Sequence, residues 1–285
     1  MSDNDTGTPG YVYILESPST NYIKIGGTGI CPMKRVREIN MTDPYKQLGP
    51  WHLTDFRQVA DWRLVEHFLH ATFIRPRVYE IEGQKELFSA SAIAVRNRLN
   101  QIEPKQLVGK PKVDRMFMDE PFREYLIRLF AFTGLAQWMD YQGAWTFSLF
   151  PSTGRGRYFT LSIASHEVAF STLSHRNVKQ CNMLYMDDSI LHQQDTMTWL
   201  KKHQGESYTN DYATALPRGV SILIHSDFDV MLEFIEQLGV RRAVLAYWIE
   251  SLLTLKENDR LSAYARWHNY NAVATIWNSV RAVTP

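Results

Sequence analysis

The sequence is poor in cysteine, in long apolar runs and in net charge. Its two cysteines, Cys31 and Cys181, are too few for a disulfide framework and are typical of a reducing compartment. No apolar run approaches the length of about eighteen residues that a transmembrane helix needs, and the polar N-terminus lacks the apolar segment of a secretory signal. We therefore expect a cytoplasmic protein.

The net charge of +1, from 31 basic and 30 acidic residues, does not by itself indicate a nucleic-acid partner. Any binding of DNA must come from a local patch of charge. Hydrophobic residues make up 45% of the chain, which is enough to bury a substantial core and excludes a disordered tail.

The residue pattern predicts an α+β fold in two domains, residues 10–100 and 115–285. Between them, residues 101–114 carry Pro104, Pro111 and three lysines with little periodicity, so we expect a linker. The second domain matches no family by its residues, and target recognition, dimerisation and regulation are all open roles for it.

The first domain begins with a predicted β-hairpin. Tyr11–Leu15 and Tyr22–Ile25 are rich in Tyr, Val and Ile and flank a turn of Ser, Pro, Thr and Asn. Leu53–Val59 is expected to form a third strand. Helices are expected at Met33–Met41, at Asp61–Phe73, where Trp62, Val65, Leu69 and Phe73 share one face, and at Ala90–Ile102.

The second domain is predicted to combine strands with C-terminal helices. The expected strands are Trp145–Phe150, Tyr158–Ile163, Glu167–Leu173 and Val220–His225, and the expected helices are Pro121–Trp138, Asp227–Leu238, Val240–Leu255 and Asp259–Val280. The last two helices are long and apolar, and could supply a dimer interface.

Four residue types in the first domain suit metal-dependent cleavage of a phosphodiester. The reaction needs a base for water, cations that offset charge on the phosphoryl oxygens, and a metal or acid at the leaving oxygen. Tyr13 and Lys24 lie on adjacent strands and can face the same side. Arg35 can fork onto phosphate, and Glu66 offers the hard oxygen that magnesium prefers. The same groups could also simply grip DNA.

This arrangement resembles the GIY-YIG nuclease superfamily over about residues 10 to 88. Val12-Tyr13 stands at the first half of the family signature and Lys24-Ile25-Gly26 at the second. The chain is most similar to the branch that carries Lys-Ile-Gly, which is found in phage and prokaryotic proteins and is often described as DNA-binding. Glu66 with His70, and Glu86 followed by Leu-Phe, are also typical of that branch.

The resemblance implies a three-stranded antiparallel sheet flanked by helices. Tyr13 would be the general base or the group that orients water, Arg35 would stabilise the transition state, and Glu66 would be the sole protein ligand of a Mg²⁺ or Mn²⁺ ion. Lys24 replaces the second signature tyrosine, and a late asparagine has no clear counterpart. We expect Lys24 to neutralise phosphate charge and to lower the pKa of Tyr13.

Further residues are candidates with open roles. His70 could position Glu66, contact phosphate, donate a proton or be structural, and Glu86 could organise the site or cap a strand. Lys34, Arg37 and Thr28 are candidate DNA contacts, although an exposed helix face and a turn would explain them equally.

Three functional interpretations follow. The first is a metal-dependent DNA endonuclease in restriction or phage-related defence, with a homodimer as one expected form because a single module cuts a single strand. The alternative is a catalytically inactive DNA-binding or regulatory module of the same fold. The third is a small α+β adaptor without nucleic acid, for which the near-neutral net charge is the best argument.

Overall fold

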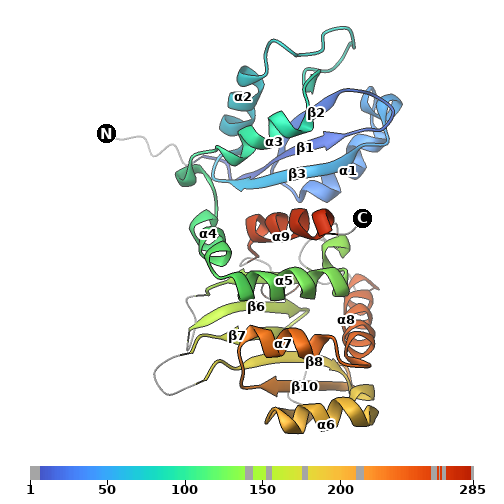
Figure 1. Cartoon of the computed structure of the whole chain (residues 1–285). Helices are drawn as coiled ribbons and strands as arrows, with labels where there is room; N and C mark the ends of the chain where they lie inside the picture. The colour runs from blue at the N-terminus through green and yellow to red at the C-terminus, as the bar shows by residue number, and fades with distance from the viewer. Residues whose placement is uncertain are drawn as a thin grey trace. The chain divides into compact units, whose positions relative to one another are not determined.

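Two units of mixed helix and strand make up the chain, Met1–Pro111 and Lys112–Pro285 (Figure 1). The computed structural model describes residues 7–138, 144–151, 156–174, 179–209, 215–257, 262, 264 and 268–283. The boundary falls within the segment that we expected to be a linker, but helix α4 (Lys110–Met118) crosses it. Val113 and Met116, three positions apart and buried, give this short helix an apolar side.

The first unit is built on an antiparallel sheet in the order β3-β1-β2-β4. The hairpin strands are β1 (Gly10–Glu16) and β2 (Ile23–Thr28), and β3 (His52–Val59) pairs with β1. The prediction of three strands is one short, because β4 (Leu87–Phe88) adds a fourth. A strand of two residues is too short to show alternation in a sequence.

Three helices cover this sheet, each beginning at a recognisable signal. Pro32 starts α1 (Pro32–Met41), while Asp61 and Ser91 cap α2 (Trp62–Thr72) and α3 (Ala92–Asn100) with their side chains. Two short 3₁₀ segments, η1 (Tyr45–Leu48) and η2 (Pro104–Gln106), complete the unit. The predicted helices are therefore confirmed to within a few residues at each end.

The strand register sorts the hairpin side chains onto two faces. Tyr13 pairs with Gly26 and Leu15 with Lys24, so Tyr13 and Lys24 point to the same face, as predicted. That face is approached by α1. The opposite face packs against α2 and α3 in a core that includes Val12, Ile14, Ile25, Val65, Leu69, Val95 and Leu99.

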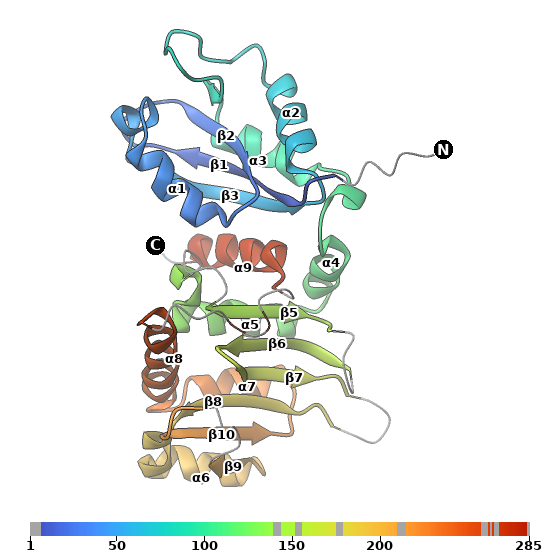
Figure 2. The same cartoon turned by 180° about the vertical axis from the view of Figure 1, so that it is seen from behind.

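The second unit holds a six-stranded antiparallel sheet in the order β5-β6-β7-β8-β10-β9 (Figure 2). Its strands are β5 (Trp145–Leu149), β6 (Arg157–Ile163), β7 (His166–Thr172), β8 (Asn182–Asp187), β9 (Glu206–Thr209) and β10 (Gly219–Ile224). The four predicted strands are confirmed, whereas β8 and β9 were not predicted. All six residues of β8 are buried, so its sequence lacks the alternation of a half-exposed strand.

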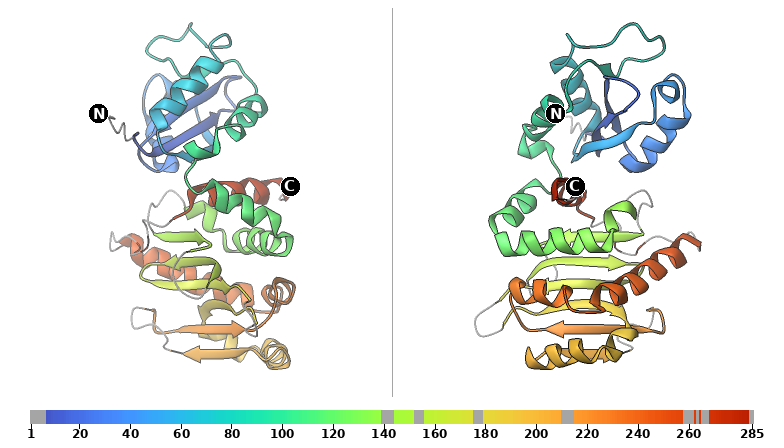
Figure 3. Two further views of the ribbon diagram at one scale, coloured as in Figure 1. Left: turned by 90° about the vertical axis from the view of Figure 1, so that its left-hand side faces the viewer. Right: turned by 45° about the vertical axis from the view of Figure 1, so that its right-hand side comes forward.

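The helices of this unit are α5 (Glu120–Thr133), α6 (Gln194–Lys202), α7 (Phe228–Ile235), α8 (Val240–Glu257) and α9 (Tyr270–Val283), with η3 (Leu135–Trp138) and η4 (Asp188–His192) (Figure 3). The apolar side of α8, expected at a dimer interface, is buried on β8 within its own unit, where Trp248 donates to the Tyr185 carbonyl oxygen at 2.8 Å. Much of the expected start of the last helix, residues 259–261, 263 and 265–267, lies outside the described residues. Within the described part of the chain, no helix has the length and apolar character required to cross a bilayer.

Gly27 provides a test of the packing between β2 and α2. A β-carbon at this position would lie 2.3 Å from Cε3 of Trp62 and 3.1 Å from a carboxylate oxygen of Glu66. Because such overpacking costs on the order of 1–3 kcal/mol, Gly27→Ala should destabilise the first unit. Hydrogen–deuterium exchange of peptides from residues 10–28, recorded at increasing urea concentrations, measures the change in the free energy of unfolding.

The matched control is Gly29→Ala. There the nearest atom, Trp62 Nε1, would be 3.8 Å from the new β-carbon, which is ordinary contact. The free energy of unfolding of this variant should lie within about 0.5 kcal/mol of that of the parent chain. Equal loss of protection in the two variants would contradict the close approach of α2 to Gly27.

Candidate active site

The ring of Tyr13 crosses the neighbouring strand β2 at Gly26, the glycine of the Lys24-Ile25-Gly26 motif. A β-carbon on Gly26 would lie 2.5 Å from the hydroxyl oxygen of Tyr13. The ring therefore fits only because position 26 has no side chain. Tyr13 is 1% exposed, so its hydroxyl lies at the bottom of the site and not on the surface.

Arg35 reaches the same phenol from α1. Its guanidinium lies close enough to the phenol to lower the pKa of Tyr13, and its Nη1 donates a hydrogen bond to Glu38 Oε2 at 2.9 Å. The bond to Glu38 is the main reason that the pKa of Arg35 is raised. With 42% of its side chain exposed, Arg35 places a permanent positive charge between the buried phenol and solvent.

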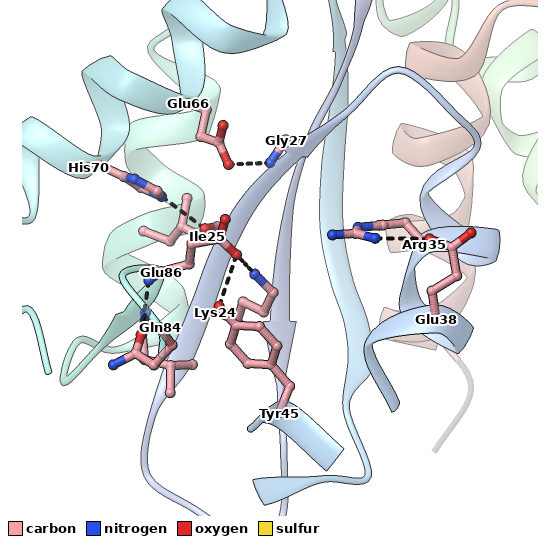
Figure 4. Close-up of polar contacts among 11 residues, drawn as sticks. Lys24, Ile25, Gly27, Arg35, Glu38, Tyr45, Glu66, His70, Gln84 and Glu86 are labelled. Atoms are coloured by element: carbon pink, nitrogen blue, oxygen red, sulfur yellow. Dashed lines mark hydrogen bonds and ion pairs between the residues drawn. The ribbon is translucent and has the colours of Figure 1, made fainter. Parts of the chain in front are cut away.

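Glu66 approaches from α2 at the edge of the sheet. Its Oε1 accepts a hydrogen bond from the Gly27 amide at 2.6 Å (Figure 4). This amide is available because β4 pairs with β2 only at Ile23 and Lys24. The carboxylate also raises the pKa of Tyr13, so the groups on β1, α1 and α2 act on one another within one site.

The pKa of Tyr13 is raised to about 12, chiefly by burial. Glu66 and Tyr45 raise it further, while Arg35 lowers it. The expectation that Lys24 would make this phenol more acidic is therefore wrong, because removal from water outweighs the nearby positive charge. Tyr13 is protonated at neutral pH and acts there as a hydrogen-bonding group.

Lys24 does not present its charge at the surface. The side chain is fully buried, and its ammonium contacts the Glu86 carboxylate and lies 4.4 Å from the centroid of the Tyr45 ring (Figure 4). Burial lowers the pKa of Lys24, while the adjacent carboxylate favours its charged form. Its expected role in neutralising a bound phosphate does not fit this inward orientation.

Tyr45 is a further residue of the site that the sequence analysis did not predict. It lies in η1, its hydroxyl donates to Glu86 Oε2 at 3.2 Å, and its backbone carbonyl accepts from Trp51 Nε1 at 2.8 Å. Burial raises its pKa, and both Arg35 and Glu66 act on its hydroxyl. No sequence signal marks Tyr45, because its partners are distant along the chain and its own segment is irregular.

His70 and Glu86 are both occupied by neighbours. The His70 Nε2 atom lies 2.9 Å from the carbonyl oxygen of Ile25, and its ring packs against Phe88. Burial lowers the pKa of His70, so a neutral ring with a proton on Nε2 fits this contact. His70 thus ties α2 to β2 one helical turn from Glu66, and Glu86 receives both Lys24 and Tyr45.

The three candidate DNA contacts differ in exposure. Lys34 and Arg37 are exposed on α1 beside Arg35. Thr28 is buried, and its hydroxyl oxygen accepts the Ile30 amide at 3.2 Å, which stabilises the turn after β2. Lys34 and Arg37 are therefore better placed than Thr28 to meet a phosphate.

Among the described residues, no group of three or more His, Cys, Asp or Glu side chains is arranged to enclose a metal ion. Oε1 of Glu66 accepts the hydrogen bond from the Gly27 amide, which leaves Oε2 available as a metal ligand. Magnesium commonly keeps several waters and binds through one or two carboxylates together with substrate phosphates. Glu66 therefore fits an ion that it holds together with substrate. The described side chains do not enclose an ion on their own.

The burial of Tyr13 predicts its titration. A phenol whose pKa is raised stays protonated to higher pH, so the ring ¹³Cζ resonance of Tyr13 should keep its neutral position at a pH where an unperturbed tyrosine, with a pKa of about 10, is half ionised. Arg35→Ala should move the transition higher still, because Arg35 lowers this pKa. Tyr13→Phe assigns the signal, and a Tyr13 transition near the unperturbed value would contradict the burial.

Comparison with known proteins places this site within a single recognised domain. Residues 10–103 match the family model of the T5orf172 domain, a phage-associated domain of a nuclease-like type. No curated protein and no solved structure matches the chain. The groups contributed by Tyr13, Arg35 and Glu66 therefore all lie in the stretch that is similar to T5orf172 domains.

Proposed function

We propose that residues 10–103 form a DNA endonuclease module that depends on a divalent metal, Mg²⁺ or Mn²⁺. The observation that carries this proposal is the convergence of three groups from separate elements. Arg35 and Glu66 both lie near enough to the Tyr13 hydroxyl to affect its pKa, although the three residues come from β1, α1 and α2. The match to a nuclease-like, phage-associated domain supports the same reading.

Each group then has a distinct task. Arg35 stays charged and half exposed, so it can fork onto the phosphoryl oxygens and stabilise the charge that grows there. Glu66 would hold the metal through Oε2, and a bound divalent ion would supply Lewis-acid stabilisation of the phosphoryl group. Tyr13, protonated and close to Arg35, would help to position the guanidinium.

The second candidate is a DNA-binding or regulatory module of the same fold without catalysis. The burial of Tyr13 favours it, because a hydroxyl that is almost inaccessible meets substrate only if the site opens. The inward orientation of Lys24 also favours it. A cleavage assay on single-stranded, duplex and branched DNA separates the two functions, since the second predicts binding without product.

Removal of the Glu66 charge should abolish cleavage and spare binding. Glu66→Gln keeps an oxygen for the Gly27 amide but weakens the metal site, so the initial nicking rate in Mg²⁺ or Mn²⁺ should fall by roughly 10²-fold or more. DNA affinity, measured by fluorescence anisotropy, should change little.

The control is Glu82→Gln, which removes an exposed carboxylate from the loop between α2 and β4. This variant should cut at the parent rate. Normal cleavage by Glu66→Gln would reject the metal role of Glu66.

The exposed cations of α1 should govern binding and not the chemical step. Each phosphate contact contributes about 0.9 to the slope of log affinity against log salt, so Lys34→Ala with Arg37→Ala should make that slope shallower by about 2. Cleavage at saturating DNA should be unchanged.

The matched control removes the same charge elsewhere in the unit. Arg75→Ala with Lys85→Ala alters two exposed cations of the α2–β4 loop. An equal change of slope in both double variants would show that net charge, and not contact by α1, sets the affinity.

A further inference from the structure

The proposed function assigns roles to Tyr13, Arg35 and Glu66. It assigns none to a neighbouring cluster formed by Lys24, Glu86 and Tyr45. The Lys24 ammonium contacts the Glu86 carboxylate and lies under the face of the Tyr45 ring, at 4.4 Å from its centroid. The same Glu86 oxygen accepts the Tyr45 hydroxyl at 3.2 Å. Strand β2, the segment before β4 and η1 therefore meet at a single carboxylate oxygen (Figure 4).

The cost of this arrangement argues against a purely stabilising role. Lys24 is fully buried, whereas Glu86 keeps 34% of its side chain exposed. Removing an ammonium from water costs several kcal/mol, and apolar side chains of similar volume often serve stability as well as a buried ion pair does. What the pair does fix is the place of Tyr45, whose ring and hydroxyl are both held by it.

Tyr45 is also the more accessible of the two phenols. Tyr13 is 1% exposed, whereas Tyr45 is only half-buried. The Lys24 ammonium lies 4.4 Å from the centroid of the Tyr45 ring and 5.9 Å from that of Tyr13, so the two phenols flank the same side chain. Tyr45 is therefore better placed than Tyr13 to touch a molecule that lies against Arg35.

We propose that Tyr45 is the phenol that contacts the attacking water at the reacting phosphate group, and that Lys24 and Glu86 are the positioning residues that hold it there. This inference rests on the proposed nuclease function. Tyr45 donates its proton to Glu86, so its oxygen can accept a hydrogen bond from the attacking water and orient it. Lys24 acts on the reaction only through Glu86 and Tyr45, and never contacts DNA.

The first test is single-turnover cleavage by the full chain in Mg²⁺ and in Mn²⁺. Tyr45→Phe keeps the ring over Lys24 but removes the hydroxyl, so the rate should fall by about 10²-fold while DNA affinity changes less than about twofold. The control is Tyr79→Phe, because Tyr79 is 69% exposed on the α2–β4 loop, and it should cut at the parent rate.

The second test asks whether Lys24 works through Tyr45. Lys24→Met should slow cleavage in the parent chain, yet add no further loss in the Tyr45→Phe background, because the group that it positions is already gone. A directly acting or merely structural lysine would reduce the rate equally in both backgrounds. Glu86→Gln, which keeps an acceptor for Tyr45 but loses the charge, gives the same comparison if Lys24→Met folds poorly.

The outcomes separate this inference from the function on which it rests. No product from the parent chain with either metal would overturn the nuclease function itself. Normal cleavage by Tyr45→Phe, beside an inactive Glu66→Gln, would overturn only the role of Tyr45. The ring ¹³C resonance of Tyr45 should shift in Lys24→Met whether or not the chain cuts DNA, and an unshifted resonance would overturn the positioning role.

Discussion

The site can form because two consecutive residues of one strand are glycines, which have no β-carbon. Gly26 and Gly27 are consecutive in β2, so they open toward opposite faces of the sheet. On one face the Tyr13 ring crosses Gly26, and on the other Trp62 and Glu66 close onto Gly27. Because these two positions carry no side chains, the Tyr13 ring and helix α2 can both approach β2 closely, from opposite faces.

Burial then decides which of the groups carry charge. It raises the pKa of Tyr13 and lowers the pKa values of Lys24 and His70, so each of these three groups is shifted toward its neutral form. Arg35 is the exception, since a guanidinium stays charged and this one remains half exposed. Of these four groups, Arg35 is the one that keeps its charge, which suits the phosphate-binding role proposed for it.

Local patterns in the sequence were sufficient for most of the elements around the site. Strand-forming residues around a turn predicted the hairpin, helical spacing predicted α2, and Asp61 marked its first turn. Strand β4 has only two residues and β8 is buried throughout, so neither shows an alternating pattern. The pKa of Tyr13 was predicted in the wrong direction because the depth of burial depends on packing between distant segments. The role of Tyr45 escaped for the same reason, since its contacts with Lys24 and Glu86 join segments far apart along the chain.

The hydrogen bond from the Gly27 amide to Glu66 has a consequence for how the sheet senses its surroundings. Any cation that draws electron density from the Glu66 carboxylate weakens its hold on that amide, and any cation that leaves restores it. The end of β2, which pairs with β1 but extends beyond β4, would be linked to any such cation through the Glu66 carboxylate. Loading of such a cation and opening of the contact between β2 and α2 at Gly27 would then be two sides of one equilibrium.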